Sequence, residues 1–175
     1  QLLEKIIARE AAMFIAVKAS EPADCQEMLK TFYLMREMSH SVLAADTLTS
    51  YLQDLETAAA AGRNLMTEKY ARMENLIPSL NENELIYKIV DIEREVHKKY
   101  PLTIAVEGGF TTYAVCELET YSDATLNLYY RDIFLAATQK RNLVEERYQY
   151  LYGNLGFKDL EEVEALAQKR AAVKE

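Results

Sequence analysis

The sequence predicts an all-α protein, and three observations support this prediction. The 175 residues include only 5 Gly and 3 Pro, which is too few for the many turns of a loop-rich β fold. Half of the residues are hydrophobic, and the good helix formers Ala, Leu, Glu, Lys, Gln, Arg and Met dominate. Apolar residues recur at helical spacing along most of the chain. We therefore expect one helical domain over residues 1–175, with about seven helices.

Three of these helices are expected in the first half of the chain. Residues 2–18 carry an apolar residue at every third or fourth position, and residues 25–41 form the second helix. Residues 45–76 show one long helical pattern with Gly62 near its middle. A glycine at such a position indicates a kink or a close helix crossing.

Four helices are expected in the second half, over residues 83–99, 110–120, 122–152 and 159–173. Ser122 and Asp159 are suitable N-caps for the last two of these helices. Residues 101–109, the only stretch with strand-like chemistry, are interpreted as a connecting loop. The last helix is weakly apolar, so we expect it to pack on the outside of the domain.

An internal repeat at a shift of 78 residues relates the two halves. Residues 47–73 align without a gap on residues 125–151, and 11 of the 27 positions are identical. Both copies contain the run Arg-Asn-Leu. We therefore expect two diverged helical repeats, over about residues 6–76 and 85–152, packed about a pseudo-two-fold axis.

The repeated polar residues lie beside the apolar stripe of each copy. On one helix, Asp54, Asn64 and Glu68 fall on one flank of the stripe, and Arg63 and Tyr70 fall on the other. Two interpretations are open. Acids of one half could pair with arginines of the other half and hold the halves together, or the polar groups could converge on a ligand between the halves.

Charge and composition exclude several classes of function. The formal net charge is -8, and such an acidic field repels phosphate backbones, so we expect no nucleic-acid partner. No apolar run of about 18 residues is present, so we expect no membrane partner. The two cysteines are too few for a disulfide framework, which favours a reduced compartment, and we expect the cytoplasm.

Two candidates for chemistry each have a structural alternative. Cys25 begins a helix, where a thiol becomes more nucleophilic, but its nearest candidate base, His40, lies about four turns along the same helix. A small buried hydrophobe is the alternative role for this cysteine. Glu37 and His40 have the Glu-x-x-His spacing of dinuclear metal sites, but the repeat mate of this segment has no histidine. We expect no metal and no cofactor, and the question of enzymatic activity stays open.

Several segments resemble a known bacterial family. CQEMLKTFYLMREMSH, YLQDL, AAGRNLMTEKYARM and TYAVCELETYSDATLNLY are similar to the family described as domain of unknown function 4125, and the similarity runs from about Ile6 to Gly153. The positions that match the family pattern are Cys25, Gln26, Lys30, Thr31, Phe32, Met35, Arg36, Arg63, Asn64 and Tyr70. The chain departs from that pattern at Ser39 and His40 and in having no tryptophan. The resemblance implies no catalytic motif, and it implies a nucleotidyltransferase-like protein as a partner.

The functional hypothesis is a small anionic or polar metabolite bound between the two repeats. Arginine recognises carboxylates and phosphates, and an arginine that points inward is costly unless it is paired, which makes Arg36 the first residue to test. The expected ligand-binding residues are Cys25, Gln26, Tyr33, Arg36, Arg63, Asn64, Tyr113, Arg141 and Asn142. The alternative is a helical protein–protein interaction module, either homodimeric or bound to a nucleotidyltransferase-like protein.

Overall fold

The computed structural model describes residues 1–18, 25–104 and 109–174, and these residues form nine α-helices, one 3-10 helix and no strand. The all-α prediction is confirmed. In order, the elements are α1 (Leu2–Lys18), α2 (Cys25–His40), α3 (Ala45–Ala60), α4 (Leu65–Met73), α5 (Leu85–Glu93), η2 (Arg94–Lys98), α6 (Phe110–Leu118), α7 (Asp123–Thr138), α8 (Leu143–Asn154) and α9 (Leu160–Val173). Residues 105–108 of the expected connecting loop lie outside the described residues.

The expected number of seven helices is wrong because a tight turn breaks each of the two long helical patterns. Gly62 has φ of 73° and Lys140 has φ of 58°, a left-handed backbone conformation in which an α-helix cannot continue. Gly62 therefore lies between α3 and α4, and Lys140 lies between α7 and α8. A Cβ added at Gly62 would have no atom within 4 Å, so this glycine does not mark a close helix crossing.

The asparagine of each Arg-Asn-Leu run begins the helix that follows the turn. The side-chain oxygen of Asn64 accepts hydrogen bonds from the backbone N–H groups of the next helix, and its amide donates to the Met13 carbonyl at 2.9 Å. Asn142 caps α8 in the same way and donates to the Ile92 carbonyl at 3.3 Å. Each asparagine thus satisfies the free end of a helix and ties the turn to α1 or α5. The predicted caps Ser122 and Asp159 also accept hydrogen bonds from their helices.

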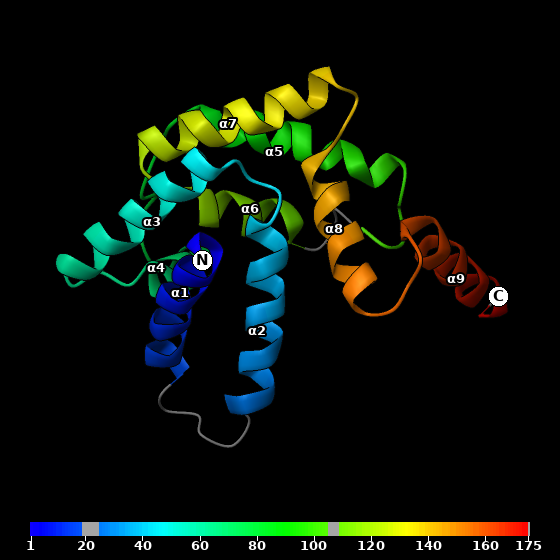
Figure 1. Cartoon of the computed structure of the whole chain (residues 1–175), viewed down its shortest axis with the longest axis horizontal. Helices are drawn as coiled ribbons and strands as arrows, with labels where there is room; N and C mark the ends of the chain where they lie inside the picture. Colours follow the sequence, from blue (N-terminus) through cyan, green and yellow to red (C-terminus); the bar gives the residue numbers. More distant parts are fainter. Residues whose placement is uncertain (19–24, 105–108, 175) are drawn as a thin grey trace.

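Helices from the two halves of the chain pack against each other (Figure 1). α5 and α7 lie along the top, α1 and α2 descend below them, and α6 lies in the middle. α1 packs on α2, α3 and α4, and α3 packs on α7. α4 packs on α6 and α8 packs on α2, so the fourth α-helix of each half meets the second α-helix of the other. Among the described residues, none of the helices combines the length and the apolarity that crossing a bilayer requires.

The described residues form one large core and one small apolar cluster. The large core includes the fully buried Ile6, Leu55, Ile86 and Leu126 and joins helices from both halves. The small cluster consists of Val96, Tyr100, Ile104, Val144 and Leu160. Leu160 attaches α9 to this cluster, and Glu164 of α9 accepts from the backbone N–H groups of Leu102 and Thr103. α9 extends away from the other helices at the end of the molecule (Figure 1). The weakly apolar last helix therefore packs on the outside, as expected.

Candidate functional site

A buried ion pair joins α1 to α2 at the centre of the first half. Glu10 is 0% exposed and Arg36 is 2% exposed. Arg36 Nη2 donates to Glu10 Oε2 at 2.7 Å, and Arg36 Nε lies 3.1 Å from Oε1. The hydroxyl of Tyr51 donates to Oε2 at 2.7 Å, and His40 Nε2 lies 3.0 Å from Oε1. Glu10 is thus surrounded by hydrogen-bond donors, which compensate for its removal from water.

Both members of this pair remain charged. Burial alone would raise the pKa of Glu10, but the Arg36 guanidinium and the His40 ring hold it well below its ordinary value. Burial would likewise lower the pKa of Arg36, and the nearby Glu10 and Glu117 carboxylates raise it instead. A salt bridge therefore lies inside the helical core.

A second part of the network connects Arg36 to α4 and α6. Arg36 Nη1 lies 2.6 Å from Glu117 Oε1, and Lys69 Nζ lies 3.2 Å from the same oxygen. Both cations also donate to the hydroxyl oxygen of Tyr113, at 3.3 Å from Arg36 and 3.1 Å from Lys69. Burial would raise the pKa of Glu117, but the charges of Arg36 and Lys69 lower it to about 2. Glu117 therefore stays ionised between two cations.

Among the described residues, one N–H of Lys69 and the O–H of Tyr113 have no acceptor. The ammonium of Lys69 has three N–H groups and donates two of them, to Tyr113 and to Glu117. The Tyr113 oxygen accepts from both cations, and its own O–H has no acceptor among the residues that the structure describes. Because the Tyr113 side chain is 40% exposed, its O–H can reach a molecule outside the core.

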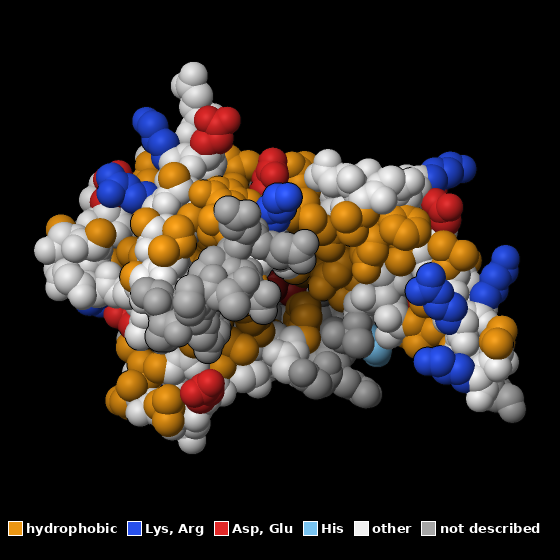
Figure 2. Space-filling model, turned by 90° about the horizontal axis from the view of Figure 1, so that it is seen from below, with side chains coloured by type: hydrophobic (Ala, Val, Ile, Leu, Met, Phe, Trp, Pro, Cys, Tyr) orange, Lys and Arg blue, Asp and Glu red, His pale blue; other side chains and the backbone are white. Residues whose placement is uncertain are grey.

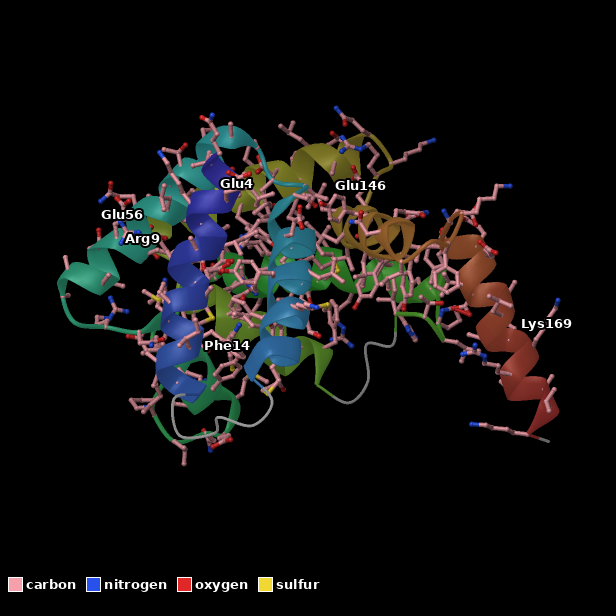
Figure 3. All side chains as sticks on the ribbon, turned by 60° about the horizontal axis from the view of Figure 1, so that its bottom comes forward. Glu4, Arg9, Phe14, Glu56, Glu146 and Lys169 are labelled. Carbon is pink, nitrogen blue, oxygen red and sulfur yellow. The ribbon has the colours of Figure 1, made fainter. Side chains whose placement is uncertain are left out.

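A hollow of ≈ 730 Å³ lies directly against these donors, and we name it the Arg36 pocket. It is lined by Phe14, Met28, Thr31, Phe32, Met35, Arg36, Lys69, Tyr70 and Tyr113. Phe14 and Phe32 stack with their ring centroids 4.3 Å apart, and Figure 3 places Phe14 on the lower part of α1. Seen from below, hydrophobic side chains cover much of the surface of the molecule (Figure 2). The pocket therefore combines apolar walls with a charged end.

The structure brings together two of the nine predicted ligand-binding residues, Arg36 and Tyr113. Arg36 points inward and is paired, as the sequence argument requires of a buried arginine. Tyr33 is 42% exposed and does not line the pocket. Cys25 and Gln26 begin α2, but their side chains lie outside the described residues.

The other four predicted residues belong to the two tight turns. Asn64 and Asn142 are helix caps. Arg63 Nε donates to Glu68 at 2.8 Å, and Arg141 Nη2 donates to Glu146 at 2.7 Å. Each turn folds its arginine back onto the acid five residues later, so Arg63 and Arg141 do not meet acids of the opposite half. The repeated acids Asp54 and Asp132 do bond across the halves, since each accepts from a backbone N–H of the other half.

A family model described as "Protein of unknown function (DUF4125)" matches residues 1–165. The chain belongs to this family. The match confirms the resemblance seen in the sequence and extends it at both ends. No curated protein and no solved structure matches the chain. All residues of the Arg36 pocket lie inside the region that defines the DUF4125 family.

Sequence reasoning missed Glu10, Lys69 and Glu117 in this DUF4125 protein. Glu10 gave a usable signal, because an acid in the middle of the apolar stripe of residues 2–18 indicates a buried partner. Lys69 and Glu117 gave no such signal, since they are 48 positions apart in the sequence and lie on different helices. Among the described residues, no group of three His, Cys, Asp or Glu side chains is placed to hold a metal ion.

Proposed function

We propose that this DUF4125 protein binds a small molecule with an apolar body and an anionic or polar head group in the Arg36 pocket. The observation that carries this proposal is the pair of unused donors, on Lys69 and Tyr113, at the end of a mainly apolar hollow. Small-molecule sites commonly combine apolar walls with a few convergent polar groups. No other described part of the molecule presents a cationic donor to a hollow of this size.

The chemistry of the donors favours an anionic head group. One donor is an ammonium, and the other is a phenol polarised by two cations that donate to its oxygen. Hydrogen bonds from such groups to a carboxylate or phosphate are stronger than those between neutral groups. Met28 and Met35 can adapt to the shape of an apolar body, because the methionine side chain is flexible.

The proposal is tested by titrating benzoate into the protein and measuring the rise in melting temperature. Tyr113→Phe removes the donor and keeps the ring, so it should weaken binding about tenfold. The matched control Tyr33→Phe removes the hydroxyl of an exposed tyrosine outside the pocket and should bind benzoate like the wild type. Equal affinities for all three proteins would overturn the role of Tyr113. Absence of any benzoate response in the wild type would overturn the proposal for this class of head group.

We also infer that the two repeats are related by a pseudo-two-fold axis. Equivalent contacts across the halves support this inference. Asp54 Oδ2 accepts from the Ser122 backbone N–H at 2.9 Å, and its repeat mate Asp132 accepts from the Ala44 N–H at 3.0 Å. The test is to superpose residues 44–75 on 122–152 in an experimental structure. A rotation far from 180° would contradict the axis.

A homodimeric interaction module is the second candidate function, and the exposed side of α9 favours it. A hollow of ≈ 470 Å³ runs along this helix, with Leu102, Phe157 and Leu166 in its lining. Leu102 and Leu166 are exposed although they are apolar. A second copy of the chain could cover these side chains. Light scattering after size exclusion tests this candidate, and a monomer at high protein concentration would contradict it.

We propose a cytoplasmic location on the basis of the thiol in α6. Cys116 is buried and free, and burial raises the pKa of its thiol. Free thiols persist in reducing compartments. Cell fractionation tests the location, and recovery of the protein outside the cytoplasmic fraction would contradict it.

A further inference from the structure

A second hollow, of ≈ 420 Å³, lies on the other side of Met35 and Tyr113 from the Arg36 pocket. Met38 and Val144 line it from α2 and α8, and Phe110 lines it from α6. Met35 and Tyr113 line both hollows. Two cavities therefore share one wall and differ in the rest of their lining.

The charged groups of this second hollow come from α5 and α8. Arg147 is 8% exposed, and its Nη1 donates to Glu93 Oε1 at 3.1 Å. Arg147 Nη2 donates to the Tyr129 hydroxyl at 2.5 Å, and Nε donates to the Ser39 carbonyl at 2.9 Å. A guanidinium has five N–H groups, so two of them have no acceptor among the residues that the structure describes. The remaining N–H groups of Nη1 and Nη2 can donate to a molecule in the hollow that Arg147 lines.

The charges at this site select a neutral acceptor. Glu93 is buried and already balances the charge of Arg147, and Tyr129 donates to the same carboxylate at 2.8 Å. A second carboxylate would be buried next to Glu93 without a cation of its own, which is costly. A carbonyl or amide oxygen can accept from the free N–H groups without that cost.

We infer that this hollow, which we name the Arg147 pocket, is a second binding site that takes a neutral, mainly apolar molecule with a carbonyl or amide oxygen. The site is separate from the Arg36 pocket and differs from it in the charge of its ligand. The inference does not depend on the function proposed for the Arg36 pocket, since its donors and most of its walls are different residues.

Methionine methyl groups provide a reporter for each pocket. Met28 lines only the Arg36 pocket, Met38 lines only the Arg147 pocket, and Met35 lines both. Met13 and Met66 are buried and line neither, so they serve as references. NMR spectra of protein labelled with ¹³C at the methionine methyl groups can therefore locate a bound probe.

The experiment compares benzamide, which is neutral, with benzoate, which is anionic. Benzamide should shift the Met38 signal in a saturable way, with a Kd on the order of 1 mM for a ligand of this size, and should leave Met28 unchanged. Benzoate should shift Met28 and not Met38. A benzamide titration without a Met38 response overturns the Arg147 pocket, whereas a benzoate titration without a Met28 response overturns the proposed function of the Arg36 pocket.

A pair of variants separates binding in the pocket from an effect elsewhere. Ala114→Leu places a larger side chain in the lining of the Arg147 pocket and should weaken benzamide binding at least about tenfold. The matched control is Ala124→Leu, at an exposed position on α7 outside both hollows, and it should bind benzamide like the wild type. Unchanged binding by Ala114→Leu would overturn the assignment. The Met38 response of the wild type remains decisive if that variant does not fold.

Discussion

Arg36 Nη2 and Glu10 Oε2 lie 2.7 Å apart, and both side chains are closed off from water between α1 and α2. The same guanidinium reaches Glu117 on α6, so one arginine holds three helices together. A buried pair of this kind contributes little net stability as a whole, but the loss of one partner leaves an uncompensated charge in the core. The stability of the protein should therefore be very sensitive to changes at either residue.

Glu10→Gln should lower the free energy of unfolding by about 3–5 kcal/mol, because it leaves the charge of Arg36 without its main partner. Urea denaturation measures this loss. The matched control is Glu56→Gln, which breaks the exposed ion pair with Arg9 (3.8 Å, Figure 3) and should cost no more than about 1 kcal/mol. The double variant Glu10→Leu/Arg36→Met removes both charges and should recover part of the loss. Equal costs for Glu10→Gln and Glu56→Gln would contradict the assigned role of the pair.

The free energy of unfolding should decrease as the pH is lowered through the acid range, because Glu117 becomes protonated. Its pKa is lowered from the ordinary 4.5 to about 2 in the folded protein, so it stabilises the fold at pH above 4.5. That contribution, about 3 kcal/mol, should be lost as the pH falls from about 4.5 to about 2. Urea midpoints across this range measure it, and Glu117→Gln should flatten the curve. The control Glu74→Gln, at an exposed position, should keep the pH dependence of the wild type. A pH dependence of Glu117→Gln identical to that of the wild type would refute the prediction.

Asn64→Ala and Asn142→Ala should each lower the free energy of unfolding by about 1–2 kcal/mol, because each removes a helix cap. The two losses should add, since the asparagines lie in different turns. Asn127→Ala, at an exposed position inside α7, should change stability by no more than about 0.5 kcal/mol. Thermal and urea denaturation provide the comparison. Losses at the two turns no larger than that at Asn127 would show that the caps are unimportant.

The left-handed turn residues should respond to substitution with opposite signs. Gly62→Ala should destabilise by about 1 kcal/mol, and Lys140→Gly should stabilise by about the same amount, because only glycine adopts this backbone conformation without strain. Gly153 lies in α8 outside the left-handed region, so Gly153→Ala should stabilise by about 0.5–1 kcal/mol. Melting temperatures measure all three. A stabilising Gly62→Ala would contradict the geometry of the turn.

Helix termini were predictable where a side-chain cap marks them. Ser122 and Asp159 identified the starts of α7 and α9 correctly. The turns at Gly62 and Lys140 were missed, because the helical spacing of apolar residues runs through both of them without a break. Asn64 and Asn142 did carry a signal, since asparagine is a favoured N-cap, but the repeat suggested a shared ligand instead.

The candidate site was predictable only in part. Arg36 was identified because an inward-pointing arginine needs a partner, and Tyr113 was among the expected ligand-binding residues. Lys69 could not be identified, because its neighbours on α4 follow an ordinary polar pattern and its partners come from α6. Contacts between distant segments depend on how the helices cross, and local periodicity does not determine this.

The packing of helices across the two halves has a consequence for a cleaved chain. α4 packs on α6, and α8 packs on α2, so residues 1–76 and 84–175 each lack a neighbour when they are separated. If the chain were cleaved between these segments, neither fragment would retain all the groups around Lys69. Recovery of the native state would then be a bimolecular reaction, and its extent would rise with fragment concentration.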